Sequence, residues 1–162
     1  MLGGDTIRHR LHLLSNQPKT KLHSQLDHGS VSRLAKIAGC EPVAMHPEVA
    51  AARGLKSGDF VKVHNDRGSR ICGLVVSAEV MANVIQLSTG AWYDPEYEAT
   101  DKKVDDQLIC KHSNPNVLTV DRGTSSLAHG PVAYSCLVEV SFFLGILPEA
   151  TAHIPPVIAD RT

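Results

Sequence analysis

Three polar segments of the 162-residue chain carry residue types that bind polar ligands. The first, residues 15–25, combines hydroxyl, amide, imidazole and ammonium groups and contains no acidic residue. Lys19 can supply charge to a phosphate, and the amides can read the edges of a heterocycle. Residues 113–116 contain an Asn-Pro turn signal, and residues 123–131 hold small hydroxyl residues whose backbone N–H groups can cradle an anion. A solvated loop also explains residues 15–25, so the residues alone leave both interpretations open.

The sequence contains no catalytic or metal-binding motif. There is no Gly-x-Ser-x-Gly nucleophile elbow, and no pair of carboxylates is set off for acid–base chemistry. Among nine histidines, only His9 and His12 lie within four residues of one another, and the cysteines form no Cys-x-x-Cys pair. We therefore predict binding rather than catalysis, with no structural zinc or iron–sulfur site. The cysteines are expected to be buried thiols in a reducing compartment: Cys40, Cys72, Cys110 and Cys136.

The composition is typical of a single globular domain. The length and the 43% hydrophobic content are enough to bury a core without disulfides or metal. The formal net charge of −1 provides no basic field for general nucleic-acid binding. No run of eighteen apolar residues exists, and residues 1–10 lack the apolar region of a signal peptide. We therefore expect neither nucleic acid nor a membrane span.

The apolar periodicity predicts a mainly β protein with two short helices. Helical spacing and end signals occur at residues 31–38 and 47–53. From Phe60 the apolar period changes to two, and Asn65-Asp66-Arg67-Gly68 is a hairpin signal. Short strands are expected at residues 11–14, 41–45, 60–64, 70–77, 84–88, 117–120 and 137–141. Strands at this spacing favour a closed β architecture over alternating βαβ units.

Two segments lie outside the strand pattern. Residues 94–106 are charged and poor in apolar side chains, which predicts a surface excursion. The tail after Phe143 contains three prolines and is expected to be extended. Its apolar residues are too numerous for a free terminus, so they should cover either this domain's own edge or a neighbouring domain: Phe142, Phe143, Leu144, Ile146 and Leu147.

The polar segments and strands together resemble a known family. The matching stretches are LHLLSNQPKTKLHSQLDHG at 11–29, EPVAMHPEVAAARGLKSGDFVKVHNDRGSRICG at 41–73 and NPNVLTVDRGTSSLAHGP at 114–131. They resemble the C-terminal domain of molybdopterin oxidoreductases, the dimethyl sulfoxide reductase family. The segments Leu-His-Ser-Gln at 22–25 and Asn-Val-Leu-Thr at 116–119 are similar to the branch that reduces biotin sulfoxide, dimethyl sulfoxide and trimethylamine N-oxide.

This resemblance implies a six-stranded double-psi β-barrel of the ADC-like class over residues 11–141, with a lead at 1–10 and an extended tail at 142–162. It implies that the barrel binds part of a molybdopterin guanine dinucleotide. The implied contact residues are Ser15, Gln17, Lys19, His23, Ser24, Gln25, Asn116 and Tyr134. Gln17 stands where relatives often have His, and His129 where they often have Gln; both substitutes still donate and accept hydrogen bonds.

The resemblance also implies what this chain lacks. Molybdenum, its protein ligand and the substrate funnel belong to the remaining domains of a full-length oxidoreductase, so the chain alone is expected to be inactive. The expected location is cytoplasmic, or periplasmic if a parent enzyme carries an export signal upstream. Two alternatives remain open: a stand-alone double-psi barrel interaction module without cofactor, and a self-processing decarboxylase that cleaves at Gly29-Ser30 or Gly68-Ser69.

Overall fold

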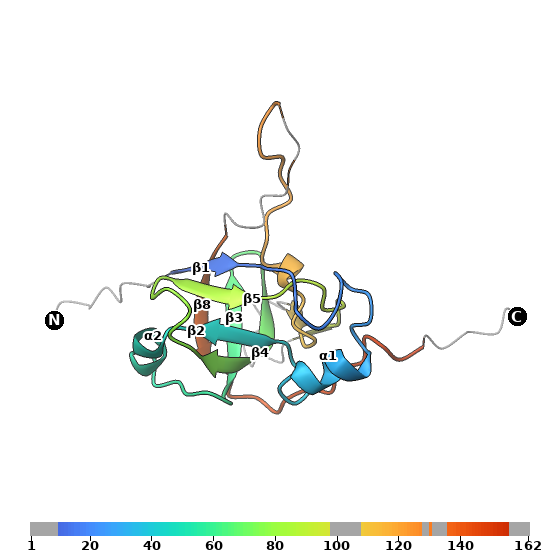
Figure 1. Ribbon diagram of the computed structural model, residues 1–162, viewed down its shortest axis with the longest axis horizontal. Helices are drawn as coiled ribbons and strands as arrows, with labels where there is room; N and C mark the ends of the chain where they lie inside the picture. The colour runs from blue at the N-terminus through green and yellow to red at the C-terminus, as the bar shows by residue number, and fades with distance from the viewer. Residues whose placement is uncertain (1–9, 98–107, 128–129, 131–135, 156–162) are drawn as a thin grey trace, which may run out of the picture.

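A closed barrel of six strands forms the centre of the molecule (Figure 1). The computed structural model describes residues 10–97, 108–127, 130 and 136–155. The barrel strands are β1 (Leu11–Leu14), β2 (Pro42–Met45), β3 (Phe60–Asn65), β4 (Gly68–Val76), β5 (Val84–Leu87) and β8 (Leu137–Phe142). They run in the order β2-β5-β1-β8-β3-β4, and the parallel pairing of β4 with β2 closes the ring. The predicted mainly β fold, a six-stranded double-psi barrel, is confirmed.

The barrel interior follows directly from the period of two in the sequence. Each barrel strand contributes two residues, at positions i and i+2, to one apolar core, because successive side chains of a strand point to opposite faces. These pairs are Leu11 and Leu13, Val43 and Met45, Val61 and Val63, Cys72 and Leu74, Ile85 and Leu87, and Val138 and Val140. Ala50, Leu55, Leu118 and Cys136 complete this core. Burial of these aliphatic side chains is the main driving force for folding.

The two helices are shorter than predicted. They are α1 (Ser30–Ala35) and α2 (Pro47–Ala51). α2 begins at Pro47, and the preceding His46 accepts a hydrogen bond from the backbone N–H of Glu48. α1 ends at Ala35 because the backbone of Lys36 is extended, and positive φ at Ala38 and Gly39 then closes a turn between Ile37 and Cys40. Ile37 then packs against β4 at Gly73, where no side chain would fit.

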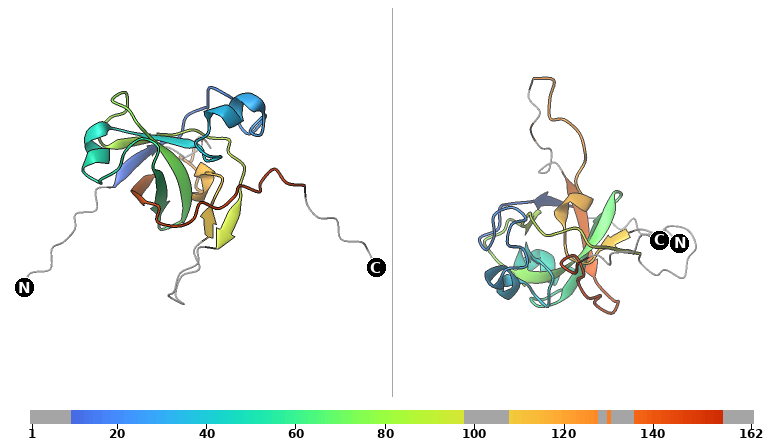
Figure 2. Two further views of the ribbon diagram at one scale, coloured as in Figure 1. Left: turned by 90° about the horizontal axis from the view of Figure 1, so that it is seen from below. Right: turned by 90° about the vertical axis from the view of Figure 1, so that its right-hand side faces the viewer.

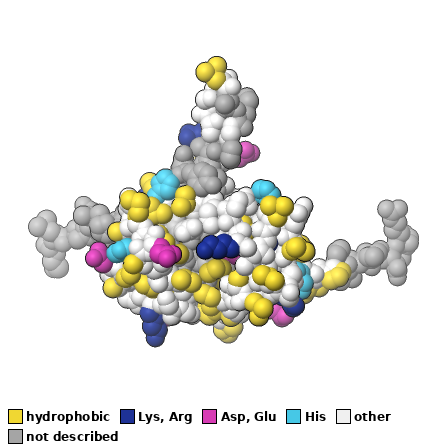
Figure 3. All heavy atoms as spheres, in the orientation of Figure 1, with side chains coloured by type: hydrophobic (Ala, Val, Ile, Leu, Met, Phe, Trp, Pro, Cys, Tyr) yellow, Lys and Arg dark blue, Asp and Glu magenta, His cyan; other side chains and the backbone are white. Residues whose placement is uncertain are grey.

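The predicted apolar face of α1 is exposed rather than buried. Val31 and Leu34 are 62% and 87% exposed, whereas Ser32 is buried. Figure 3 shows exposed hydrophobic side chains on the face of the molecule that carries α1. The apolar spacing therefore indicated the helix correctly but not its buried face.

One predicted strand is wrong. Residues 117–120 do not form a strand; Pro115–Val117 is instead a 3-10 turn, η1. Pro115 fixes the backbone there, and the Asn114 side chain accepts from the N–H of Asn116, which caps the turn.

The predicted surface excursion begins with a strand: β6 (Pro95–Tyr97) pairs antiparallel with β7 (Leu108–Cys110), which extends the sheet from β4. Residues 98–107 lie outside the described residues.

The tail after β8 covers the domain's own edge with one face only. Phe143 and Leu147 pack against a second apolar cluster that contains Ile71 and Ile109. Leu144 and Ile146 point outward and are 91% and 95% exposed. The tail therefore covers an edge of its own domain, as one of the two expectations held, but only through Phe143 and Leu147. The lead at 1–9 lies outside the described residues.

One charged side chain interrupts the apolar interior. Arg70 of β4 is fully buried, and none of its guanidinium nitrogens has a hydrogen-bond partner among the described residues. It lies beside the Cys72 thiol, whose pKa is raised by burial despite the neighbouring positive charge. Burying a charge without partners costs free energy.

We predict that Val63→Ala lowers the free energy of unfolding by about 2 kcal/mol, because it removes two methyl groups from a fully packed core. Val31→Ala, at an exposed position of α1, is the matched control and should change the free energy by less than about 0.5 kcal/mol. Urea denaturation measures both changes. Equal costs at the two positions would contradict the assignment of the core.

We predict that Arg70→Met stabilises the chain by about 1 kcal/mol or more, because an apolar side chain of similar length replaces a buried charge that has no hydrogen-bond partner among the described residues. The same denaturation experiment measures the shift in midpoint. Destabilisation by this variant would show that the guanidinium has a partner in the folded protein.

Candidate functional site

A polar cleft lies at one end of the barrel, where two adjoining cavities of about 430 and 470 Å³ share Tyr93, Asn114 and Asn116. We call this the polar cleft. Its remaining lining residues are His23, Ser24, Arg67, Gly68, Thr89, Gly90, Ala91, Trp92 and Val117. Among the described residues, no carboxylate lines either cavity, so the cleft suits an anionic or heterocyclic ligand.

The first wall of the cleft is the loop 21–28. A tight turn, closed by a hydrogen bond from the N–H of Gln25 to the carbonyl of Leu22, presents His23 and Ser24 at its tip. The loop approaches residues 89–93 so closely that a Cβ at Gly90 would overlap the carbonyl oxygen of His23. Trp92 joins the two segments, since its indole N–H donates to the carbonyl of Ser24 over 2.9 Å.

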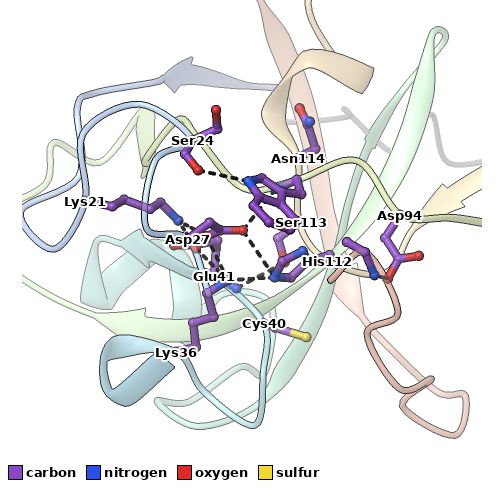
Figure 4. Close-up of polar contacts among 12 residues, drawn as sticks. Lys21, Ser24, Asp27, Lys36, Cys40, Glu41, Asp94, His112, Ser113 and Asn114 are labelled. Atoms are coloured by element: carbon purple, nitrogen blue, oxygen red, sulfur yellow. Dashed lines mark hydrogen bonds and ion pairs between the residues drawn. The ribbon is translucent and has the colours of Figure 1, made fainter. Parts of the chain in front are cut away.

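A buried charge cluster lies beneath this loop (Figure 4). We define it as Lys21, Asp27, Lys36 and Glu41. Each ammonium contacts both carboxylates: Lys21 is 2.5 Å from Asp27 and hydrogen-bonded to Glu41, and Lys36 is 2.9 Å from Asp27 and 3.3 Å from Glu41. Two positive charges therefore balance two negative charges out of contact with water.

The cluster reaches the second segment of the cleft through Asp27. Its Oδ2 accepts from the backbone N–H of Trp92 over 3.1 Å. Burial by itself raises the pKa of Asp27, but hydrogen bonds from Lys21 and Lys36, the charge of Lys36 and the Trp92 N–H outweigh it and lower that pKa. An ionised Asp27 thus holds the loop 21–28 and residues 90–93 together.

His112 completes the cluster as a neutral base. Its Nε2 lies 2.6 Å from the Lys36 ammonium, while Nδ1 is buried without a partner among the described residues. Burial and then the charge of Lys36 lower the pKa of His112, because protonation would bring a third positive charge into the cluster. Nε2 therefore accepts from Lys36, and Nδ1 carries the proton.

The opposite wall of the cleft is residues 113–118. Ser113 adopts positive φ, donates its hydroxyl to the carbonyl of Ile71 and accepts from the N–H of Glu41. At the other end, Asn65 and Arg67 donate to the carbonyl of Leu118 at 2.9 and 2.7 Å. The β3–β4 hairpin, which the sequence predicts, therefore also fixes the segment that carries Asn114 and Asn116.

The structure brings together three of the predicted contact residues. His23, Ser24 and Asn116 line the polar cleft, and Gln17 is one contact away, with Nε2 3.1 Å from Nδ1 of His23. Ser15 is buried, and its hydroxyl has no partner among the described residues.

The other predicted contacts lie apart from the cleft lining. Lys19 and Gln25 are exposed and do not line the two cavities, and Tyr134 lies outside the described residues. Residues 121–127, from the third polar segment, project away from the barrel (Figures 1 and 2). The alternative interpretation of residues 15–25 as a solvated loop does not hold at Ser15 and Lys21, which are both buried.

Sequence reasoning missed Trp92, Tyr93 and Arg67 as cleft residues. A signal for the aromatic pair was present: the chain has only 4% aromatic residues, yet its single Trp and one of three Tyr directly follow a strand and Gly90. The charge cluster left no such signal, because its members are far apart in the sequence.

The four cysteines are free and buried, as predicted. Within the described residues, no group of three His, Cys, Asp or Glu side chains could hold a metal ion. No helix in the described part of the chain is long and apolar enough to cross a membrane.

The barrel and the polar cleft at its end give the chain the architecture of a ligand-binding domain. Residues 11–137 match the family model described as "Molydopterin dinucleotide binding domain". The chain therefore belongs to the molybdopterin dinucleotide-binding domain family, as the sequence resemblance implied.

Curated relatives are oxide reductases that are much longer than this chain. It is 40% identical over 154 residues to a trimethylamine-N-oxide reductase of Haemophilus influenzae, covering 95% of this chain and 18% of the relative. It is 40% identical over 160 residues to a dimethyl sulfoxide/trimethylamine N-oxide reductase of Rhodobacter capsulatus, covering 98% and 19%. The chain thus spans under a fifth of these relatives, which makes it similar to one domain of each.

A solved structure confirms the fold. The acetylene hydratase of Pelobacter acetylenicus superposes with a TM-score of 0.62 over 82% of this chain and 18% of that protein. At 18% sequence identity, this likeness shows the barrel architecture alone.

We predict that the chain loses stability as the pH falls below 6.5, the ordinary pKa of histidine. His112 has a lowered pKa when folded, so the unfolded chain binds the proton first and acidification favours unfolding. His112→Gln, which keeps an acceptor for Lys36, should reduce this pH dependence by up to about 1.4 kcal/mol per pH unit. Urea denaturation between about pH 7.5 and pH 5 measures the slopes. Identical slopes for the two proteins would show that His112 is not the group responsible.

Proposed function

We propose that the polar cleft binds part of a molybdopterin guanine dinucleotide, and that residues 11–141 are the cofactor-binding domain of a longer oxidoreductase that reduces S- or N-oxides. The observation that carries the proposal is the cleft itself, in which His23, Ser24 and Asn116 meet from distant parts of the sequence. The named activities of the curated relatives support the class of substrate. We assign no catalytic residue and no metal ligand to this chain.

The chemistry of the cleft fits this cofactor. Trp92 and Tyr93 offer aromatic faces to a pterin or guanine ring, and the side chain of Asn116 can bond to a heterocycle edge. His23 and Arg67 supply donors for the pyrophosphate, and no carboxylate among the described lining residues opposes its charge. The hydroxyl of Thr89 is buried in the wall without a partner among the described residues. The further proposed contacts are Ser15, Gln17, Lys19, Ser24, Gln25 and Tyr134.

When bound, the cofactor supplies the redox and oxygen-transfer chemistry through its molybdenum. The residues of this chain bind one face of the cofactor, orient its ring systems and exclude water from that face. We expect no oxide reductase activity from the chain alone.

The length of the relatives supports the proposal that other domains complete the site. Because the chain spans about 18% of those relatives, we propose that the remaining domains provide the metal ligand, the substrate funnel and the other cofactor contacts. Four free, buried thiols support a reducing, cytoplasmic location, with a periplasmic one if the parent enzyme carries an export signal.

A chimera tests the proposed function. We replace the matching domain of the Haemophilus influenzae trimethylamine-N-oxide reductase with this chain and measure bound molybdenum and guanine nucleotide per polypeptide. Lys19→Ala and His23→Ala should each reduce cofactor retention about threefold or more, because each removes a donor to the anionic part of the ligand. In the isolated chain, both variants should change stability by less than about 0.5 kcal/mol, since both side chains are exposed.

Lys56→Ala, at an exposed position outside the cleft, is the control and should retain the cofactor like the parent chimera. If Lys19→Ala and His23→Ala instead unfold the isolated chain, these residues are structural. If they retain full cofactor, their assignment to the binding site is wrong.

A further inference from the structure

The C-terminal segment is attached to one wall of the polar cleft through Asp94. This carboxylate is buried, two residues after Trp92, and it accepts three hydrogen bonds from the tail. The Thr151 hydroxyl donates to Oδ1 over 2.8 Å, the Ala152 N–H donates to Oδ2 over 2.9 Å, and the Thr151 N–H also donates to Oδ2. A hydrogen bond from the N–H of Ile154 to the carbonyl of Thr151 closes a turn at this point.

The same turn reaches the other loop of the cleft. The imidazole ring of His153 stacks on that of His28, with ring centroids 3.9 Å apart and planes inclined by 13°. His28 directly follows Asp27, which holds the loop 21–28 against Trp92. The tail therefore contacts the two segments that carry His23, Ser24, Trp92 and Tyr93, and it does so from outside the cleft.

The cleft does not itself account for these contacts. Asp94, His28 and the turn at 151–154 line neither of the two cavities, so they do not touch a ligand placed there. Three donors bond to this one buried carboxylate, and charge-assisted bonds of this kind are among the stronger hydrogen bonds. They attach the turn firmly to residues 90–94. Asp94 also lies 3.8 Å from the Lys111 ammonium, which balances its charge.

We propose that the turn at Thr151–Ile154 is a strap that holds residues 90–94 and the loop 21–28 in the arrangement that binds the cofactor. Asp94, Thr151 and His153 are then positioning residues, which act through Trp92 and the loop rather than on the ligand. The role of the strap in cofactor binding rests on the proposed function of the cleft. The contacts by which it holds the two segments together do not.

The chain contains its own reporter of this arrangement. Trp92 is the only tryptophan, and its backbone N–H and indole N–H both bond to the loop 21–28. If residues 90–94 separate from the loop, the indole loses its partner and gains water. Its emission then shifts to longer wavelength, and acrylamide quenches it more strongly.

Two truncations of the full chain form a matched pair. Truncation after Pro148 removes the strap, whereas truncation after Ile154 keeps the turn and its contacts with Asp94. We expect the shorter protein to show a red-shifted Trp92 and an acrylamide quenching constant raised about twofold or more, as for a locally opened segment. The longer protein should behave like the full chain. Both should keep the urea midpoint of the barrel, because neither cut touches the core strands.

Thr151→Pro provides a second variant in the full chain. It removes the N–H and hydroxyl donors of Thr151 and leaves Asp94 with the Ala152 N–H and Lys111. We expect the same change in Trp92 in the absence of any cofactor, and a lower cofactor content in the chimera. A purely structural role would lower the urea midpoint without a change in Trp92 at low urea.

The outcomes separate this proposal from the proposed function. If Trp92 responds to removal of the strap while the parent chimera holds no cofactor, the strap exists and the proposed function is wrong. If the chimera holds cofactor while Trp92 and cofactor content are unchanged by the Pro148 truncation and by Thr151→Pro, the strap proposal is overturned.

Discussion

The polar cleft depends on a balanced buried charge cluster. Lys21, Lys36, Asp27 and Glu41 are drawn from the loop 21–28, the end of α1 and the start of β2, and each cation contacts both anions. Such a cluster gains little net stability, because desolvation offsets much of the attraction. It does impose geometry, since removing any member leaves a buried charge without its partner. The loop over the cluster is therefore held in one position, with Asp27 bonded to Trp92.

Most of the fold could be predicted from the sequence, because the barrel core follows one local rule. The period-two alternation of apolar residues predicted the ends of β3, β4, β5 and β8 to within one or two residues. Each of these strands contributes two residues, at positions i and i+2, to the barrel interior. The rule failed where local geometry overrides it. Pro115 and the Asn114 cap turn an apolar run into η1, and β6 pairs through backbone bonds that apolar content does not reveal. The local sequence pattern also does not predict that the apolar residues of α1 face outward.

The site could be predicted only in part, because its residues meet through long-range contacts. His23, Ser24 and Asn116 were identified by resemblance to a family, and the residues alone left a solvated loop equally open. Lys21 and Glu41 are twenty positions apart, and Lys36 and His112 are separated by 76, so no spacing rule connects them. Only the closed barrel brings β2, α1 and residues 112–116 together and so defines the cleft.

The central claim is that one continuous cleft, assembled over the charge cluster, receives the nucleotide part of the cofactor. Amide and indole chemical shifts of the isotope-labelled chain, titrated with guanosine diphosphate, test this claim most directly. A half-site leaves much of the ligand in water, so binding should be weak but saturable at millimolar concentrations. The account predicts that the shifts concentrate on His23, Ser24, Trp92, Tyr93 and Asn116, with the core strands unchanged. Saturable shifts on another face of the barrel, or none at all, would contradict it.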